Sequence, residues 1–259
     1  PIVRIRADHV PKVAPADRAR PPRRTDDAAM EAFSRLYQTL DQTTSTNAKV
    51  AAMVAYFDRA APADAAWAVY FLSGRRLKRL IGSARMREWL VELSELPPWL
   101  VEDTYASVGD LAETIALLLA RPGDSRETLP LADWVEQRLL PLRGLEPEEQ
   151  RAIVTAWWLG QSYESCYIVT KLLTGSLRVG VSQTLLARAV AEHAGLERAV
   201  VLHRLMGEWT ADAAFWEGLV GEDDGRESLS RPYPFCLASP LENPPEALGS
   251  PEAWLAEWK

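Results

Sequence analysis

Apolar residues recur every three or four positions along most of this chain, which is the spacing of one face of an α-helix. The clearest run consists of Met30, Phe33, Leu36, Tyr37 and Leu40. Comparable runs predict further helices over residues 46–57, 65–73, 83–95, 98–105, 111–120, 131–140, 146–159, 161–173, 183–193, 197–206 and 212–220. The same stretch shows no convincing strand pattern. The sequence therefore predicts one all-α, multi-helix domain over residues 30–220.

The helical pattern is lost at both ends of the chain. Residues 1–29 are rich in Pro, Arg and Asp and show no helical periodicity after Val13, so we expect a disordered tail there. From Gly221 onward prolines become frequent, and a short β-like piece covers residues 233–237. This change of character predicts that residues 221–259 form a linker and the beginning of a different domain.

A basic turn between two predicted helices is the most informative local feature. The first of these helices stops at Gly175, which suits the left-handed position that follows a helix C-terminus. Ser182 suits the N-cap of the next helix. Lys171 and Arg178 lie close by in sequence, and free N–H groups at a helix N-terminus attract anions. These features together are typical of a seat for a phosphate of a nucleic-acid backbone.

A similar turn occurs earlier in the chain. Residues 71–74 read Phe-Leu-Ser-Gly and residues 172–175 read Leu-Leu-Thr-Gly, and each group precedes basic residues and a helix that starts with Ser83 or Ser182. The earlier turn carries a run of cations without an intervening acid, namely Arg75, Arg76, Lys78, Arg79, Arg85 and Arg87. One hypothesis is an internal duplication whose two turns face the two strands of a duplex. The other is two ordinary helix hairpins with solvated basic turns.

Composition narrows the classes of function. The formal net charge of -7 argues mildly against a dedicated nucleic-acid binder, although binding depends on a local basic patch rather than on the total. No apolar run approaches the ~18 residues needed to cross a bilayer, and residues 1–29 lack the apolar core of a signal peptide. Cys166 and Cys236 are expected to be buried thiols in a reducing compartment. We expect a cytoplasmic protein, and no spacing of His and Cys is typical of a metal site.

Three segments carry a resemblance to a known family, the bacterial three-domain type of ATP-dependent DNA ligases. The first is Val108-Gly109-Asp110-Leu111-Ala112-Glu113. The second and strongest runs from Leu172 to Ser182 and contains the helix–glycine–Arg-x-Gly-x-Ser turn. The third comprises the Pro-rich residues 231–238 and then Glu257-Trp258-Lys259. The resemblance covers residues 30–259.

The resemblance implies a helical DNA-binding domain with an internal pseudo-two-fold repeat, followed by the start of an α+β nucleotidyltransferase domain. Such a domain grips the minor groove at a nick without reading the base sequence. As a monomer it would serve nick sealing in DNA repair, replication and recombination. The residues that we expect to contact DNA are Arg75, Arg76, Lys78, Arg79, Lys171, Gly175, Arg178, Gly180 and Ser182.

The same resemblance assigns a catalytic role to Lys259, as the lysine that becomes adenylated. The full enzyme would use ATP and Mg²⁺, whereas we expect no cofactor to bind the residues present here. The Asp-Gly that follows this lysine in the family is absent, because the sequence stops at Lys259. We therefore expect no self-adenylation by this chain alone. The alternative function is a helical protein-interaction module that does not bind DNA, which the negative net charge would favour.

Overall fold

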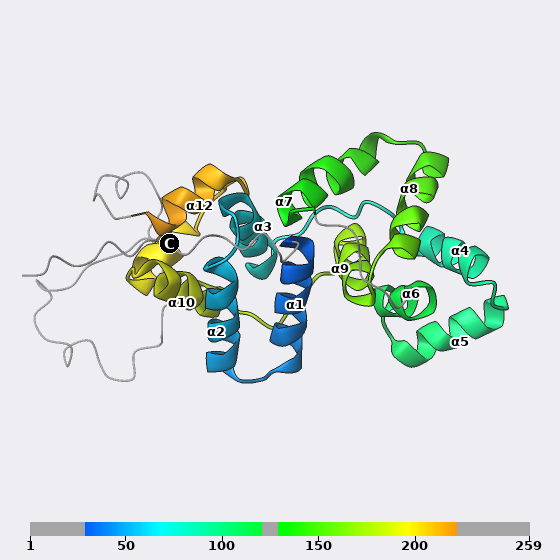
Figure 1. The fold of residues 1–259 in the computed structure, drawn as a ribbon, viewed down its shortest axis with the longest axis horizontal. Helices are drawn as coiled ribbons and strands as arrows, with labels where there is room; N and C mark the ends of the chain where they lie inside the picture. Colours follow the sequence, from blue (N-terminus) through cyan, green and yellow to red (C-terminus); the bar gives the residue numbers. More distant parts are fainter. Residues whose placement is uncertain (1–28, 121–128, 222–259) are drawn as a thin grey trace, which may run out of the picture.

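The computed structural model describes residues 29–120 and 129–221, and within these ranges every regular element is helical (Figure 1). The first six helices are α1 (Ala29–Gln42), α2 (Thr46–Phe57), α3 (Pro62–Leu72), α4 (Ser83–Ser94), α5 (Pro98–Val108) and α6 (Leu111–Leu119). After residues 121–128 follow α7 (Leu131–Asp133), the π-helix η1 (Trp134–Leu139), the 3-10 helix η2 (Leu140–Gly144), α8 (Pro147–Gly160), α9 (Tyr163–Thr174), α10 (Gln183–Ala194), α11 (Arg198–Arg204) and α12 (Ala213–Val220). The prediction of an all-α domain is confirmed for the described residues.

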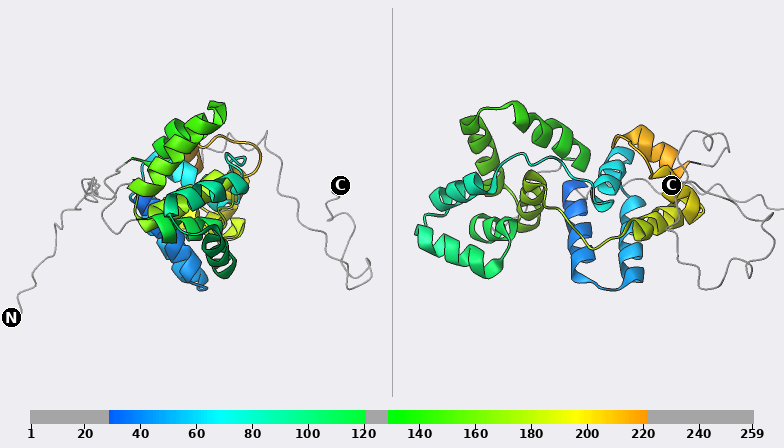
Figure 2. Two further views of the ribbon diagram at one scale, coloured as in Figure 1. Left: turned by 90° about the vertical axis from the view of Figure 1, so that its right-hand side faces the viewer. Right: turned by 180° about the vertical axis from the view of Figure 1, so that it is seen from behind.

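The helices form two lobes side by side, which the views from the front and from behind both show (Figures 1 and 2). In the first lobe α2 packs on α1 and α10, and α3 packs on α12. In the second lobe α6 packs on α4, α5, α8 and α9. Contacts of α1 with α9 and of α7 with α1 and α3 join the two lobes. The buried apolar side chains form one continuous cluster that includes Phe33, Phe57, Trp134 and Trp158.

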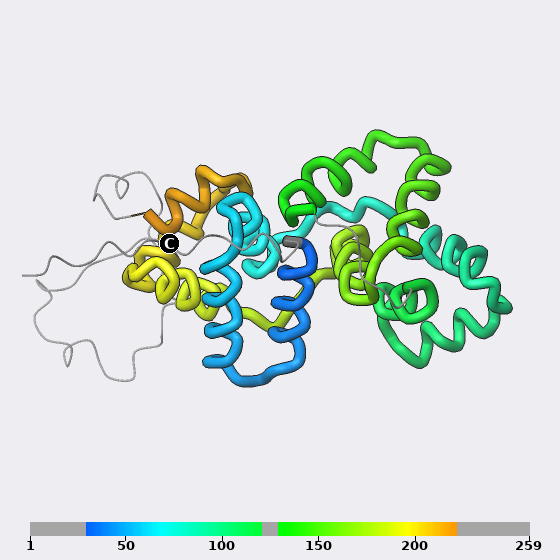
Figure 3. The backbone as a smooth tube through the Cα atoms, in the orientation of Figure 1, coloured from blue at the N-terminus to red at the C-terminus, as the bar shows by residue number. Residues whose placement is uncertain are grey.

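Two extended segments carry the chain between the lobes in opposite directions (Figure 3). We call residues 75–82, which lead from α3 to α4, the first crossover. We call residues 176–182, which lead from α9 to α10, the second crossover. Any chain that leaves a lobe and later returns to it makes two opposite passages, so the internal duplication stays a prediction.

Local sequence signals account for many of the helix ends. Ser45, Asp110, Ser162, Ser182 and Asp212 each accept a hydrogen bond from the amide three residues onward, as side chains at the N-cap do. The predictions for Ser182 and Gly175 are confirmed, because Gly175 follows α9 with a φ of +65°. The serine at the start of α4 behaves differently. Ser83 is the first helical residue, and Gly82 occupies the N-cap without a side-chain hydrogen bond.

The predicted helix over residues 131–140 needs a correction, because Pro141 does not end the helical path. The chain passes from α7 into η1 and then into η2, which extends to Gly144. The Leu140 N–H donates to the Val135 carbonyl, five residues back. Proline lacks an N–H and its ring crowds the carbonyl four residues before it, so the widened π turn lets the path continue past Pro141.

Several predictions fall outside the described residues. The predicted tail over residues 1–29 lies there except for Ala29, which is the first residue of α1. The predicted second domain over residues 221–259 lies there except for Gly221, and so do Cys236 and Lys259. The predicted thiol Cys166 is buried, and this burial raises its pKa to about 12. Among the described helices, none combines the length and the apolar character that a membrane-spanning helix requires.

Candidate nucleic-acid interface

The first crossover touches the end of α9, from which the second crossover departs. The Leu80 N–H donates to the Leu173 carbonyl oxygen at 3.0 Å, which ties the first crossover to the end of α9. A Cβ atom at position 175 would lie only 2.9 Å from the Leu77 carbonyl oxygen, so the close approach requires glycine there as well as the left-handed φ. The structure therefore brings together the two turns that the sequence shows far apart.

Each crossover has a buried apolar anchor with at least one exposed cation next to it. Leu77 and Ile81 are buried in the first crossover and Leu177 is buried in the second. The side chains that remain exposed are those of Arg76, Lys78, Arg79 and Arg178. Alternation of this kind arises because successive side chains of an extended segment point to opposite sides. The apolar side chains hold the segments on the core, and the cations stay in contact with solvent.

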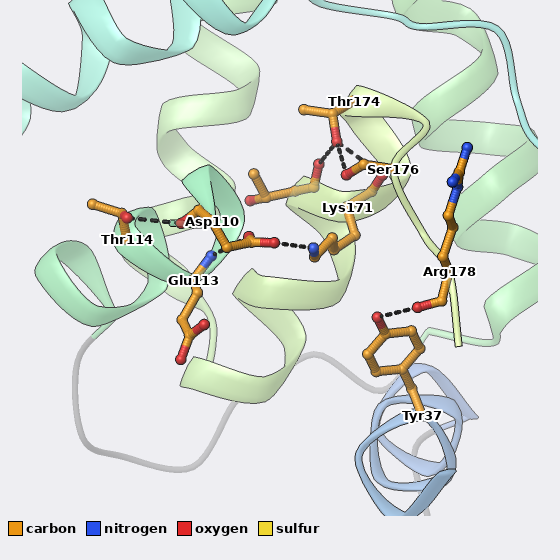
Figure 4. Close-up of polar contacts among 9 residues, drawn as sticks. Tyr37, Asp110, Glu113, Thr114, Lys171, Thr174, Ser176 and Arg178 are labelled. Carbon is orange, nitrogen blue, oxygen red and sulfur yellow. Dashed lines mark hydrogen bonds and ion pairs between the residues drawn. The ribbon is translucent and has the colours of Figure 1, made fainter. Parts of the chain in front are cut away.

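Two of the predicted DNA-contacting residues already have partners within the protein. The guanidinium of Arg75 donates to the Gly207 carbonyl at 2.6 Å, and its central carbon lies 4.1 Å from the centre of the Trp209 ring. Lys171 is only 8% exposed and forms an ion pair with the carboxylate of Asp110. Figure 4 shows the side chains of Lys171 and Asp110 meeting between α9 and the start of α6. These contacts favour a structural role for Arg75 and Lys171, while direct DNA contact by them stays a prediction.

The ion pair between Lys171 and Asp110 connects two segments that are far apart in the sequence, the N-terminus of α6 and the end of α9. Asp110 caps α6 by accepting from the Glu113 N–H at 3.1 Å, and its second carboxylate oxygen meets Lys171. Lys171 lies one turn before Gly175, on the helix that leads into the second crossover. The segment around Asp110 therefore fixes the end of α9 from which the second crossover departs.

The backbone of the second crossover is held by side chains from the first lobe. The Tyr37 hydroxyl on α1 donates to the Arg178 carbonyl at 2.9 Å, and the Lys49 ammonium on α2 donates to the Gly180 carbonyl at 2.8 Å. A tight turn centred on Gly180 follows, in which the Val181 N–H donates to the Val179 carbonyl. Sequence reasoning missed Tyr37 and Lys49, because each lies on an amphipathic helix with no local sign of a distant partner.

The start of α10 offers part of the predicted phosphate seat. The Ser182 hydroxyl accepts from the Leu185 N–H at 3.2 Å, so the serine itself satisfies one of the first amides of the helix. The side chains of Ser182, Gln183 and Thr184 are exposed. The N–H groups of the first turn give the helix N-terminus a partial positive charge, which would attract an anion placed beside Arg178.

The part of the chain that the structure describes contains no cluster of metal-ligand side chains. Within residues 29–120 and 129–221, no three His, Cys, Asp or Glu side chains gather as a metal ion would require. The ATP and Mg²⁺ predictions depend on Lys259, which the structure does not describe. The described interface is thus one of cations, backbone amides and hydroxyl groups.

Comparison with known proteins agrees with this geometry. Residues 29–191 match the family described as DNA ligase N terminus, so the chain belongs to that family. Among individual proteins, the chain is similar to a "Probable DNA ligase" of Koribacter versatilis (strain Ellin345), with 27% identity over 241 residues. The match covers 89% of this chain and 41% of that protein, so the chain spans less than half the length of its relative.

Proposed function

We propose that this chain binds duplex DNA at a nick, without reading base sequence, as the N-terminal part of an ATP-dependent DNA ligase. Membership of the DNA ligase N-terminal family supports a role on DNA. The observation that carries the proposal is the hydrogen bond between the first crossover and the end of α9, the helix from which the second crossover departs. The exposed cations of the two crossovers are Arg76, Lys78, Arg79 and Arg178. Two turns from opposite lobes that meet in this way could engage both strands of one duplex.

The chemistry of this region suits the backbone of DNA better than its bases. Cations and helix N-termini bind phosphate oxygens, and such contacts give affinity and register but carry no sequence information. The net charge of -7 is compatible with this, because phosphate binding depends on charge within about one Debye length, roughly 8 Å at physiological salt. Our proposed set of direct contacts consists of Arg76, Lys78, Arg79 and Arg178, together with the backbone near Gly180 and Ser182.

The ligase reaction belongs to this proposal only for the whole protein. Lys259 is the proposed site of adenylation, and ATP and Mg²⁺ are the proposed cofactors. A lysine acts as a nucleophile when desolvation or a neighbouring cation lowers its pKa. Mass spectrometry of this chain after incubation with ATP and Mg²⁺ tests whether it becomes adenylated, and we expect no AMP adduct on Lys259.

The DNA-binding proposal is tested by the fluorescence anisotropy of a labelled duplex, intact or nicked, titrated at several salt concentrations. We expect affinity to fall steeply with salt, and the nicked duplex to bind more tightly than the intact one. Arg178→Glu should lower affinity and leave the thermal midpoint nearly unchanged, since its side chain is exposed. The matched control is Arg59→Glu. Arg59 is an exposed arginine in the turn after the end of α2, whereas Lys49, which holds the second crossover, lies in the first turns of that helix.

Two results would contradict the proposal. Absence of binding, or binding that salt does not weaken, would favour the alternative of a helical protein-interaction module. Equal losses with Arg178→Glu and Arg59→Glu would show that attraction is general rather than centred on the crossovers.

A further inference from the structure

The two crossovers share a contact that their sequences do not reveal. In each of them a tyrosine hydroxyl donates to the backbone carbonyl of an exposed arginine. Tyr37 donates to the Arg178 carbonyl at 2.9 Å, and Tyr70 donates to the Arg76 carbonyl at 3.1 Å. The tyrosines come from different helices, α1 and α3, and only Tyr70 is close in sequence to its arginine.

This hydrogen bond constrains the backbone from which each arginine side chain departs. The carbonyls of an extended segment have no helical partner, so they need another donor or water. A fixed carbonyl restricts the ψ angle of its arginine and therefore the direction of the arginine Cβ. In Figure 4 the Arg178 carbonyl faces Tyr37, while the side chain extends away from the tyrosine ring. The contact also turns a partially negative oxygen toward the protein rather than toward an approaching phosphate.

Both tyrosine rings are themselves held in place. The Tyr37 ring is only 3% exposed and packs edge-on against Tyr167, with 5.9 Å between the ring centres. The Tyr70 ring packs edge-on against Trp67 and Trp209, with centre distances of 5.2 and 6.0 Å. Rings fixed by such neighbours can hold a hydroxyl at a defined point. Burial raises the pKa of Tyr37, so its hydroxyl keeps the donated proton at neutral pH.

We infer that Tyr37 and Tyr70 are positioning residues that orient Arg178 and Arg76, respectively, for contact with the phosphates of a DNA duplex. This inference rests on the proposed DNA binding and assigns different roles to the arginines and the tyrosines. The arginines touch DNA, and the tyrosines act only through them.

The test is a pair of double-mutant cycles on affinity for a nicked duplex. Tyr37→Phe and Tyr70→Phe each remove one hydroxyl and keep the ring, and we expect each to weaken binding about threefold to tenfold. Tyr37→Phe should have no further effect in an Arg178→Ala background, and Tyr70→Phe should have none in an Arg76→Ala background. The crossed pairs, Tyr37→Phe with Arg76→Ala and Tyr70→Phe with Arg178→Ala, should instead combine multiplicatively.

A purely structural role would give a different pattern. It would lower the thermal midpoint and the fraction of active protein, but the dependence of log affinity on log salt would keep its slope. We expect Tyr37→Phe to reduce that slope toward the value of Arg178→Ala. Tyr105→Phe, on α5 in the second lobe, is the control and should leave both affinity and slope unchanged. If Tyr37→Phe proves unstable, the cycle of the half-buried Tyr70 with Arg76 decides the matter alone.

The outcomes separate this inference from the proposed function. If the parent chain fails to bind DNA, both are overturned. If the parent binds and responds to arginine substitution, but the phenylalanine variants match the parent or keep their full effect in the matching alanine backgrounds, only the positioning role is overturned.

Discussion

The two crossovers make similar passages between the lobes but differ in what they supply. The first carries three exposed cations, Arg76, Lys78 and Arg79, and its entry is fastened by the contact of Arg75 with Gly207 and Trp209. The second carries one exposed cation, Arg178, on a backbone fixed at two carbonyls by Tyr37 and Lys49. The first crossover thus has more exposed cations, whereas the second has one cation on a backbone whose carbonyls at Arg178 and Gly180 are both bound by side chains.

The helices that lead into the crossovers, α3 and α9, are attached to neighbouring helices by different kinds of contact. On α9, Lys171 pairs with Asp110, the residue that caps α6. On α3, the buried carboxylate of Asp64 accepts directly from the Ala132 N–H at 2.9 Å, at the start of α7. Each helix is thus attached to the beginning of another helix, by an ion pair in one case and by a single carboxylate in the other.

Substitution of the two glycines at the crossover entrances should change stability by clearly different amounts. Gly74 and Gly175 both have positive φ, but only a Cβ at position 175 would meet the backbone of the other crossover. Gly74→Ala should lower the free energy of unfolding by about 1 kcal/mol, the cost of a left-handed alanine. Gly175→Ala should lower it by about 2–3 kcal/mol, since the clash with the Leu77 carbonyl adds to that cost. Urea denaturation measures both, and equal losses would contradict the tight contact.

The next effect concerns the ion pair on α9. Lys171→Met should lower the free energy of unfolding by about 2 kcal/mol, because it leaves a partly buried Asp110 carboxylate without its partner. Asp110→Asn in the same chain should recover part of that loss, since the side chain can still cap α6 without the charge. If Lys171→Met leaves stability unchanged and instead flattens the salt dependence of DNA binding, the lysine contacts phosphate directly.

Salt dependence should separate the charge of the first crossover from the geometry of the second. Replacing Arg76, Lys78 and Arg79 together by alanine should reduce the log–log salt slope by about 2.7, at about 0.9 for each phosphate contact. Arg178→Ala should reduce the slope by about 0.9. Anisotropy titrations from low to physiological salt measure both values. A slope of the triple variant equal to that of the parent would mean that the cations of the first crossover do not reach the duplex.

The smallest expected effect is at Asp64. Burial raises the pKa of this carboxyl above its ordinary value, so the folded state favours its protonated form. The resulting stabilisation is complete below the unfolded pKa of about 3.9 and is lost as pH rises through the folded pKa. At pH 7, Asp64→Asn should therefore equal the parent or exceed it by less than about 1 kcal/mol. That advantage should shrink on acidification. Asp64→Ala, which loses the acceptor for Ala132, should cost about 1 kcal/mol in urea denaturation.

Helix content was predictable because it depends on local signals. The spacing of Met30, Phe33 and Leu36 and the cap at Ser182 act within one or two turns, so no knowledge of the fold is needed to predict them. The path past Pro141 was not predictable from those signals. Proline usually ends a helix, and here a π turn accommodates it.

The candidate interface was predictable in its charges but not in its supports. Arg76 and Arg178 stand beside glycine turns, which local sequence shows. Tyr37 lies 141 positions from Arg178, and Lys49 lies 131 positions from Gly180. A tyrosine on an apolar helix face resembles any core residue, and a lysine on a helix resembles any surface residue. Only the folded arrangement shows that these side chains converge on one segment.

The opposite directions of the crossovers also bear on how the chain is made. The second lobe contains α4, α5, α6, α8 and α9, whereas the first lobe combines α1–α3 with α10–α12. During synthesis, α2 and α3 leave the ribosome long before α10 and α12, their packing partners, exist. The apolar faces of the early helices therefore stay uncovered until the second lobe has been translated, and a chain released after Thr174 would keep the later-made lobe but lack half of the earlier one.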